Sequence, residues 1–517
     1  MREDPQRLFV EAGTLAARGD HASAAALYRE CLGLLPHHPQ ILTALGIAEM
    51  ELSDLTPAIG HLRLSLAINA HQPEAWHNLA YGLQRIGRCE EALVAVCNAV
   101  AQKSSLQVSW LLRGNLEWTL GRVEQAHQSY ARAAQLCPND PQVHYNLGNT
   151  LLALMRYDEA MESYRRCLAL APNFVDAMIN LGAVYDSLGK FAEAEAFYDK
   201  ALTAVPNYAE AEWNKGVLAL ARGDFKAGLS LYERRWQTKS FAGHSIQTAQ
   251  PRWRGEDITG KTILIWAEQG LGDTIQFCRY VPMVCARAAR VIFACQPRLM
   301  DVMANLKGDF VLTSKEARQP NFDVHCPIMD LPLALGTTLE TVPADIPYLS
   351  ADPTKLKQFD AALGPGPRIG LVWSSHGMNI RGRPRNLPPR LLEPLLDLTG
   401  TFHILQKEIS PQDEAWLTGI PRLQRHDREQ KHFSDAAALV ANMDLVLTVD
   451  TSVPHLAGAL GKPVWVMLPY AADWRWLKDR ADSPWYPTVR LFRQPALGDW
   501  TSVIREIRTA LTGYFRS

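Results

Sequence analysis

A 34-residue period in the first half of the chain restricts its fold more than any other feature. Small residues recur at this spacing, and a second series of small residues follows twelve positions behind the first. Small residues let helices cross closely, aromatic rings fill the space between units, and proline ends a helix, so each unit should be two antiparallel helices. The two series are Ala12, Gly46, Ala80, Gly114, Gly148, Gly182, Gly216 and Ala24, Ala58, Ala92, Ala126, Ala160, Ala194, Gly228; the rings are Tyr28, Tyr130, Tyr164, Tyr198, Tyr232, and the prolines Pro36, Pro138, Pro172, Pro206.

The repeated unit resembles the tetratricopeptide repeat, which has the same length of 34 residues. Seven units follow one another in register over about residues 5–242. The resemblance implies an α-solenoid, a superhelix over residues 1–242 whose concave face is lined by the first helix of each unit.

Asparagine recurs at the sixth position of the unit, which faces the concave groove in tetratricopeptide arrays. An asparagine amide can donate to and accept from a peptide backbone, so a row of them can hold an extended chain. We therefore expect a groove for an acceptor protein or peptide, although asparagine is also simply frequent at this position. The residues are Asn78, Asn146, Asn180 and Asn214, while Val10, Ala44 and Leu112 occupy the position in other units.

After a polar linker, Gln237–Gly255, short apolar runs alternate with helical segments. This alternation predicts two α/β halves, at residues 243–355 and 356–517. Ligands of such folds bind beyond the carboxyl ends of the strands, so we expect a cleft between the halves. Strands are expected at Ile263–Trp266, Val291–Ala294, Phe310–Thr313, Phe322–Cys326, Arg368–Ser374, Thr401–Gln406, Asp444–Val449, Pro463–Leu468 and Val489–Phe492.

The strand Ile263–Trp266 leads into a glycine turn, with Gly270 and Gly272, and then into a helix that Asp273 opens. Such a turn brings backbone N–H groups and the positive end of a helix dipole to one point. Asp273 is therefore either a carboxylate with a chemical role or the cap of its helix. The stretch Gly255–Thr262 has the letters of a phosphate-binding loop, but it precedes a strand instead of following one, so we interpret it as a turn.

Two strand ends in the second half carry basic or amide residues. The loop after Arg368–Ser374 contains Arg381, Arg383 and Arg385. Guanidinium groups match phosphate oxygens, so the loop is a candidate diphosphate clamp, with a solvated basic loop as the alternative. The next strand ends at Gln406 and Lys407, where a lone lysine is a weak signal by itself.

A third strand end starts a helix. Thr451 or Ser452 can cap this helix, and its N–H groups can bind a phosphate. Asp450, at the strand tip, can accept a hydrogen bond from a ribose hydroxyl. His455 lies on the first turn, where it either faces a ligand or packs.

Composition excludes several classes of protein. The net charge is −1 with no basic run, so we expect no nucleic-acid partner. The acidic N-terminus does not resemble a signal peptide, and no apolar run has the length of a transmembrane segment. The nine cysteines form no C-x-x-C pair, which favours free thiols in a reducing cytoplasm.

Several segments together resemble the bacterial tetratricopeptide-repeat glycosyltransferases. They are WRGEDITGKTILIWAEQGLGDTIQF, RNLP, LQKE, DLVLTVDTSVPHLAGALGKPVWVMLPY and DWRW with DSPWYP. The catalytic half of these proteins is similar to the ADP-heptose:lipopolysaccharide heptosyltransferases, and their overall plan to the protein O-GlcNAc transferases. The resemblance implies a GT-B fold of two Rossmann-like halves, with the acceptor side in residues 243–355 and the nucleotide-sugar side in 356–517.

The resemblance also implies roles for single residues. Asp273 matches the proposed catalytic base, and Asp450–His455 match the nucleotide site. The basic residue for the diphosphate has no unambiguous match, because Arg385 and Lys407 compete for it. The expected donor-binding residues are Gly270, Gly272, Arg385, Gln406, Lys407, Asp450, Thr451, Ser452 and His455.

The implied reaction is inverting, metal-independent transfer of a sugar from a nucleotide sugar to an acceptor hydroxyl, with no further cofactor. By kinship the acceptor is a protein, such as a surface or flagellar protein. A transferase for a lipid-linked or free glycan and a catalytically inactive scaffold that binds nucleotide sugar are the alternatives. The aromatic segment Tyr470–Trp476 could stack on a sugar or pack in the core. The sugar, the nucleotide base and the oligomeric state stay open.

Overall fold

The computed structural model describes residues 4–241, 243–375, 385–420 and 422–515. Arg381 and Arg383 therefore lie outside the described residues. Contacts divide the chain into two compact units, Met1–Val184 and Tyr185–Ser517. The first is helical, and the second combines the last helices of the repeat array with two parallel sheets.

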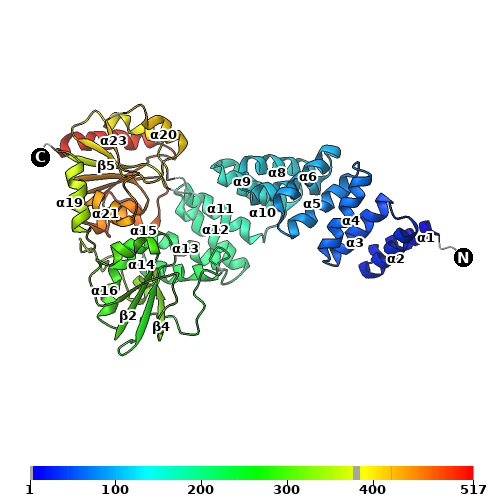
Figure 1. Ribbon diagram of the computed structural model, residues 1–517, viewed down its shortest axis with the longest axis horizontal. Helices are drawn as coiled ribbons and strands as arrows, with labels where there is room; N and C mark the ends of the chain where they lie inside the picture. Colours follow the sequence, from blue (N-terminus) through cyan, green and yellow to red (C-terminus); the bar gives the residue numbers. More distant parts are fainter. Residues whose placement is uncertain (1–3, 242, 376–384, 421, 516–517) are drawn as a thin grey trace. The chain divides into compact units, whose positions relative to one another are not determined.

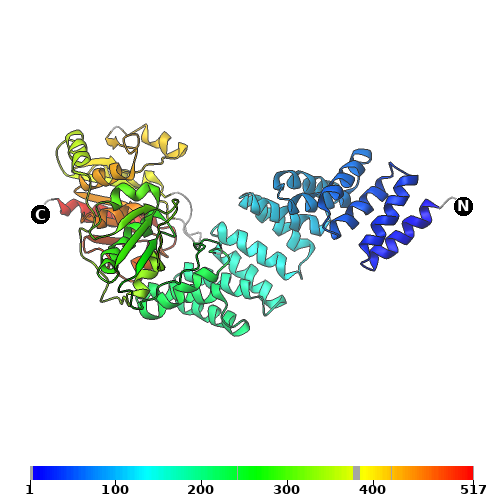
Figure 2. The ribbon, with the colours of Figure 1, turned by 60° about the horizontal axis from the view of Figure 1, so that its bottom comes forward.

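Within the described residues the array has the fourteen helices that seven two-helix units require, and the two helices of a unit pack against each other in six of the pairs. Both ribbon views show successive helices of the first unit side by side (Figures 1 and 2). The helices are α1 (Pro5–Ala17), α2 (His21–Leu34), α3 (Pro39–Glu51), α4 (Leu55–Ile68), α5 (Pro73–Arg85), α6 (Cys89–Gln102), α7 (Gln107–Thr119), α8 (Val123–Leu136), α9 (Pro141–Ala153), α10 (Tyr157–Leu170), α11 (Val175–Ser187), α12 (Phe191–Ala204), α13 (Ala209–Ala221) and α14 (Phe225–Tyr232).

The small residues lie where the helices of a pair cross, as predicted. A Cβ added at Gly114 would stand 2.6 Å from the ring of Tyr130, and one added at Gly148 would stand 2.6 Å from the ring of Tyr164. Each ring thus packs on the glycine of its own unit, so it fills the crossing within a pair and not only the space between units. A larger side chain at either glycine would force the two helices apart.

The first sheet of the second unit has four parallel strands in the order β3-β2-β1-β4. The predicted strands are confirmed within two residues at their ends. Their bounds are β1 (Thr262–Trp266), β2 (Arg290–Cys295), β3 (Val311–Ser314) and β4 (Val324–Pro327).

The second sheet has six parallel strands in the order β10-β9-β8-β5-β6-β7. Five of them were predicted, and β7 was missed because its three residues, Leu-Gln-Arg, contain no apolar run. The strands are β5 (Arg368–Val372), β6 (Thr401–Ile404), β7 (Leu423–Arg425), β8 (Leu445–Val449), β9 (Val464–Leu468) and β10 (Val489–Arg493).

Helices α15 and α21 lie between the two sheets (Figure 1), and one apolar core joins both halves. That core also takes in Trp213, Phe225 and Tyr232 from the last repeats, which explains why contacts group these repeats with the sheets. The functional division at residues 242 and 355 stays a prediction. The remaining helices are α15 (Leu271–Phe277), α16 (Val281–Cys285), α17 (Met300–Met303), α18 (Leu331–Ala334), α19 (Pro353–Ala362), α20 (Pro411–Leu417), α21 (Phe433–Ala441), α22 (Ser452–Ala459) and α23 (Trp500–Tyr514), with 3-10 turns η1 (Glu233–Gln237), η2 (Cys278–Tyr280), η3 (Pro297–Leu299), η4 (Ile328–Asp330), η5 (Pro389–Leu395) and η6 (Trp474–Trp476).

Among the described helices, none combines the length and the apolar character needed to cross a bilayer. All nine cysteines lie in the described part of the chain and are free thiols.

Candidate functional site

A cavity of about 1080 Å³ opens in the second unit, at the carboxyl ends of strands from both sheets. The loops after β1, β5, β6, β8 and β9 all reach it, as parallel α/β sheets predict. Helices of the last repeats form a further wall. The lining includes Gly270, Gly272, Asp273, Arg385, Gln406, Lys407, Asp450, Thr451, Ser452, His455, Asp473, Trp474 and Arg475, together with Trp213, Val217, Tyr232 and Phe241 from the repeat side.

The glycine turn after β1 touches the start of α22. A Cβ added at Gly272 would stand 3.0 Å from His455 Cδ2 and 3.3 Å from Ser452 Cα. A side chain at this position would push the two turns apart by a few tenths of an ångström, so the glycine favours their close approach. The structure therefore brings the predicted acid turn and the predicted nucleotide turn into direct contact.

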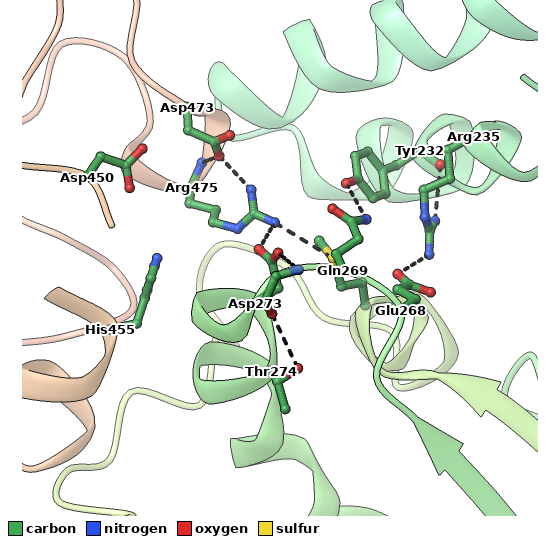
Figure 3. Close-up of polar contacts among 12 residues, drawn as sticks. Tyr232, Arg235, Glu268, Gln269, Asp273, Thr274, Asp450, His455, Asp473 and Arg475 are labelled. Carbon is green, nitrogen blue, oxygen red and sulfur yellow. Dashed lines mark hydrogen bonds and ion pairs between the residues drawn. The ribbon is translucent and has the colours of Figure 1, made fainter. Parts of the chain in front are cut away.

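Both carboxylate oxygens of Asp273 are held. Oδ2 accepts a hydrogen bond from the Gly270 N–H at 2.8 Å, which caps α15. Oδ1 accepts one from Arg475 Nη2 at 2.6 Å (Figure 3). The capping alternative is thus present, but the side chain keeps 20% of its exposure and lines the cavity. Each carboxylate oxygen has two lone pairs, so Asp273 can accept a further hydrogen bond while it caps the helix.

Arg475 shares its guanidinium between two carboxylates. Its Nη1 donates to Asp473 Oδ1 at 2.7 Å, while Nη2 reaches Asp273. Burial by itself would lower the pKa of Arg475, but Asp473 and Asp273 outweigh burial and raise this pKa. Burial would raise the pKa of Asp473, but Arg475 lowers it to about 2. The group is therefore ionised at neutral pH.

Asp450 and Arg385 lie together at the tip of β8. Arg385 Nη1 donates to the Asp450 main-chain oxygen at 3.0 Å and stands 3.6 Å from its carboxylate. Burial raises the pKa of Asp450 in spite of this guanidinium. Next along the chain, Thr451 Oγ1 caps α22 by accepting from the Val453 N–H at 3.1 Å.

His455 packs in the structure. Its ring stacks on Trp476 with centroids 5.2 Å apart, and Nδ1 lies 3.1 Å from the Tyr486 hydroxyl. Burial lowers the pKa of His455 to about 3, so the imidazole is neutral at neutral pH. The packing alternative describes these contacts, although an edge of the residue still lines the cavity.

Gln406 and Lys407 line the same cavity but have internal partners. Gln406 accepts from the Ser374 N–H at 3.2 Å and donates to the Glu408 carbonyl at 3.1 Å, which joins the loops after β5 and β6. Lys407 Nζ donates to the Asp427 carbonyl at 2.9 Å. Of the two cations that the sequence left as candidates for a diphosphate, Arg385 lies at the start of α22 and Lys407 is bonded to the Asp427 carbonyl.

A second arginine cluster lies on the repeat side of the turn. Arg235 donates to Glu268 at 2.7 Å, as Figure 3 shows, and this bond links the end of the last repeat to the end of β1. It also donates to Asp330 at 2.6 Å. Burial raises the pKa of Glu268 to about 8. Tyr232 accepts a hydrogen bond from Gln269 Nε2 at 3.3 Å and closes this wall.

Sequence reasoning missed both arginine clusters. For Arg475 and Asp473 a signal was available in the D-x-R spacing of DWRW. It was overlooked because only the two tryptophans of that segment were interpreted. Those rings are core: Trp476 is fully buried and Trp474 is 4% exposed, packed on Tyr232. Arg235 carried no local signal.

The groove asparagines of the first unit form a hydrogen-bonded series. Asn146 Nδ2 donates to Asn115 Oδ1 at 3.3 Å, and that oxygen also accepts from the Tyr130 hydroxyl at 2.8 Å. One repeat further on, Asn180 makes the same link to Asn149 at 2.8 Å. These side chains connect successive repeats and bond to one another. A peptide-binding role for them stays a prediction. Asn78 donates to the Glu74 carbonyl at 2.9 Å, and Asn214 is 8% exposed.

The array is a tetratricopeptide-like helical solenoid, and a region with parallel sheets follows it. The tetratricopeptide repeat family model matches residues 9–73. The model for the middle TPR-like domain of cilia and flagella-associated protein 70 matches residues 115–222.

Over almost its whole length the chain is similar to Protein FlbA of Caulobacter vibrioides. The two are 27% identical over 528 residues, which are 96% of this chain and 83% of the relative. Similar solved structures are those of tetratricopeptide-repeat proteins. A TPR repeat-containing protein of Cytophaga hutchinsonii covers 46% of this chain and 96% of its own, with 17% identity and a TM-score of 0.38. YrrB, described as a TPR protein with an unusual peptide-binding site, covers 36% and 97%, with 18% identity and a TM-score of 0.35.

Proposed function

We propose that the chain is an inverting, metal-independent glycosyltransferase of the GT-B type, which moves a sugar from a nucleotide sugar to an acceptor hydroxyl. The observation that carries this proposal is the contact between two turns at the mouth of one cavity. One turn, at the end of a strand of the first sheet, holds the carboxylate of Asp273. The other, at the end of β8, starts helix α22 beside the guanidinium of Arg385.

The start of α22 and Arg385 suit a diphosphate. The N–H of Val453 is capped and Pro454 has none, so an anion would reach the N–H groups of Thr451 and Ser452. Arg385 adds a planar, permanently charged donor at the same place. Together they would stabilise the charge that develops on the departing nucleotide diphosphate. In this arrangement Asp450 orients Arg385 in addition to facing the ribose.

Asp273 is placed to act as the base that removes the proton of the acceptor hydroxyl. The acceptor oxygen forms its bond to the anomeric carbon on the face opposite the diphosphate, the bond from that carbon to the diphosphate oxygen breaks, and the acceptor proton passes to Asp273. The anomeric configuration inverts because a single displacement takes place. A positioned carboxylate of this kind contributes about 10²–10⁴-fold to the rate.

The wall formed by the last repeats supports a protein acceptor. The volume of about 1080 Å³ slightly exceeds the roughly 300–1,000 Å³ of small-molecule pockets, which leaves room for an acceptor segment beside the donor. Tetratricopeptide arrays present extended concave surfaces and commonly bind peptides or proteins. An acceptor glycan is the second candidate, favoured by the aromatic side chains of Trp213 and Phe241 in the same wall.

A panel of UDP-, GDP-, ADP-, CDP- and dTDP-sugars tests the proposal. One member should raise the melting temperature, because binding stabilises the native state, and should be hydrolysed slowly without an acceptor. Asp273→Asn should lower that hydrolysis about 10²–10⁴-fold and preserve the thermal shift. Asp479→Asn is the matched control, since the Asp479 side chain is 81% exposed.

Two outcomes would overturn the proposal. If no nucleotide sugar shifts the melting temperature, the cavity does not bind the donor. If one binds but neither hydrolysis nor transfer is measured, the chain is the inactive scaffold.

A further inference from the structure

We propose that Arg475 is a positioning residue for Asp273, which holds the carboxylate of the base in place and does not itself bind the diphosphate. This inference rests on the proposed role of Asp273. Arg475 comes from the loop after β9, and Asp273 comes from the turn after β1, so the contact joins the two halves of the α/β region (Figure 3).

The guanidinium of Arg475 is already used. Nη1 binds Asp473 and Nη2 binds Asp273. Nη2 also lies 3.7 Å from Met329 Sδ. Nε is buried and has no partner among the described residues, so it faces protein and not a ligand in the cavity. The side chain as a whole is only 8% exposed. Arg385, at 23% exposure beside α22, is the better placed cation for phosphate.

Packing fixes the plane of this guanidinium. Its carbon lies 4.8 Å from the ring centroid of Trp474 and 5.8 Å from that of Phe277. Trp474 in turn packs on Phe225 and Tyr232, which belong to the last repeat. The end of the repeat array therefore supports the loop that carries Arg475, as a positioned site requires.

Asp273 is held at two points by two different elements. The Gly270 N–H fixes Oδ2, and Arg475 fixes Oδ1. Asp473 balances the charge of Arg475, so the guanidinium can orient the base without cancelling its negative charge. Other charged or titratable groups around this cluster are Glu268, Tyr232, Arg385, Asp450 and His455.

A double-mutant cycle with Arg475→Gln and Asp273→Asn tests the inference. The measured rate is hydrolysis of whichever of UDP-N-acetylglucosamine, GDP-mannose or ADP-glucose the chain turns over. Arg475→Gln should lower kcat about 100-fold, because a displaced base is a poor one, and leave the donor KM within about twofold. In the Asp273→Asn background it should cause no further loss, since Arg475 acts only through this carboxylate.

Calorimetry with UDP, GDP and ADP separates positioning from phosphate binding. The Kd of the nucleotide should be unchanged in Arg475→Gln and in Arg475→Lys, and the lysine variant should recover part of kcat because it keeps the charge but not the fork. The inference is overturned if Arg475→Gln raises the Kd of the nucleotide tenfold. It is also overturned if Arg475→Gln lowers the rate equally in the unmodified chain and in Asp273→Asn.

A ligand-free measurement keeps the inference testable if no nucleotide sugar is turned over. Carbodiimide labelling of the Asp273 carboxyl, quantified by peptide mass spectrometry, should increase severalfold in Arg475→Gln, while labelling of Asp479 stays constant as an internal control. Unchanged labelling of Asp273 would show that Arg475 does not hold it. Failure of turnover alone counts against the proposed function and not against this contact.

Discussion

Two arginines flank the turn after β1, and each bridges two carboxylates. Arg235 binds Glu268 and Asp330; the side chains of Arg235 and Glu268 are fully buried, and that of Asp330 is 7% exposed. Arg475 binds Asp273 and Asp473, whose side chains are 20% and 24% exposed. The first cluster fastens the last repeat to the first sheet, whereas the second faces the cavity.

The same ionic chemistry leads to opposite protonation. Burial raises the pKa of Glu268 to about 8 in spite of Arg235, and the neighbouring carboxylates of Asp330 and Asp273 raise it further. At Asp473 burial acts in the same direction, but Arg475 prevails and brings the pKa to about 2, with help from its own main-chain N–H and from Arg385. Because each arginine serves two carboxylates, the neighbouring charges and main-chain donors decide which carboxyl group is ionised, and the mere presence of an arginine does not.

Arg235→Gln should give the largest loss of stability. It removes the buried cation from Glu268 and leaves Asp330 with Arg252 at 3.6 Å as its cation, and breaking such a buried cluster costs about 3–5 kcal/mol in the free energy of unfolding. Arg475→Gln should cost less, because Asp273 and Asp473 are partly solvated. Thermal and urea denaturation of both variants measure the difference, and an equal or larger loss for Arg475→Gln would remove the contrast between the clusters.

Glu268→Gln should change the pH dependence of stability. The folded state keeps a proton on Glu268 up to pH about 8, whereas the ordinary pKa of the group is 4.5. The stability that this raised pKa contributes is therefore complete below pH 4.5 and is lost as the pH rises towards 8. Relative to the unmodified chain, Glu268→Gln should gain about 1.4 kcal/mol per pH unit, or about 3 kcal/mol from pH 5 to pH 7. Urea denaturation across this range checks the slope, which a flat difference would contradict.

Asp473→Asn should show the reverse dependence and a smaller effect. The depressed pKa of Asp473 contributes about 2 kcal/mol of stability above pH 3.8, which is lost as the pH falls towards 2. The variant should therefore be less stable than the unmodified chain at pH 7 and equal to it near pH 2. Thermal denaturation at both pH values tests this, and a difference that persists at pH 2 would point to packing instead of charge.

Much of the fold could be predicted from local patterns. The 34-residue period predicted the fourteen helices of the array because each unit repeats its own packing, as the glycines under the rings of Tyr130 and Tyr164 show. Apolar runs predicted nine of the ten described strands. The resemblance to glycosyltransferases led us to expect Asp273 near Asp450–His455, and the turns that carry them touch.

The arginine clusters could not be predicted in this way. Arg475 and Asp273 are 202 positions apart, and Arg235 and Asp330 are 95 positions apart. Such pairs depend on how the halves pack, which no periodicity or short motif encodes. His455 shows a related difficulty, because its position in a motif did not indicate that burial would make it a neutral packing residue.

The place where the array ends has a consequence for how such chains can diversify. Among the residues that the structure describes, those that line the cavity all belong to the second unit, and the earlier helices form a compact unit of their own. Pairs can therefore be gained, lost or resurfaced in that unit without altering the chemistry beside β1 and β8. Shortening the chain has a limit for the same reason: beginning it at residue 185 would cut through α11, which carries Asp186 of the cavity lining, and beginning it at residue 243 would remove the wall that supports Trp474 and Arg475.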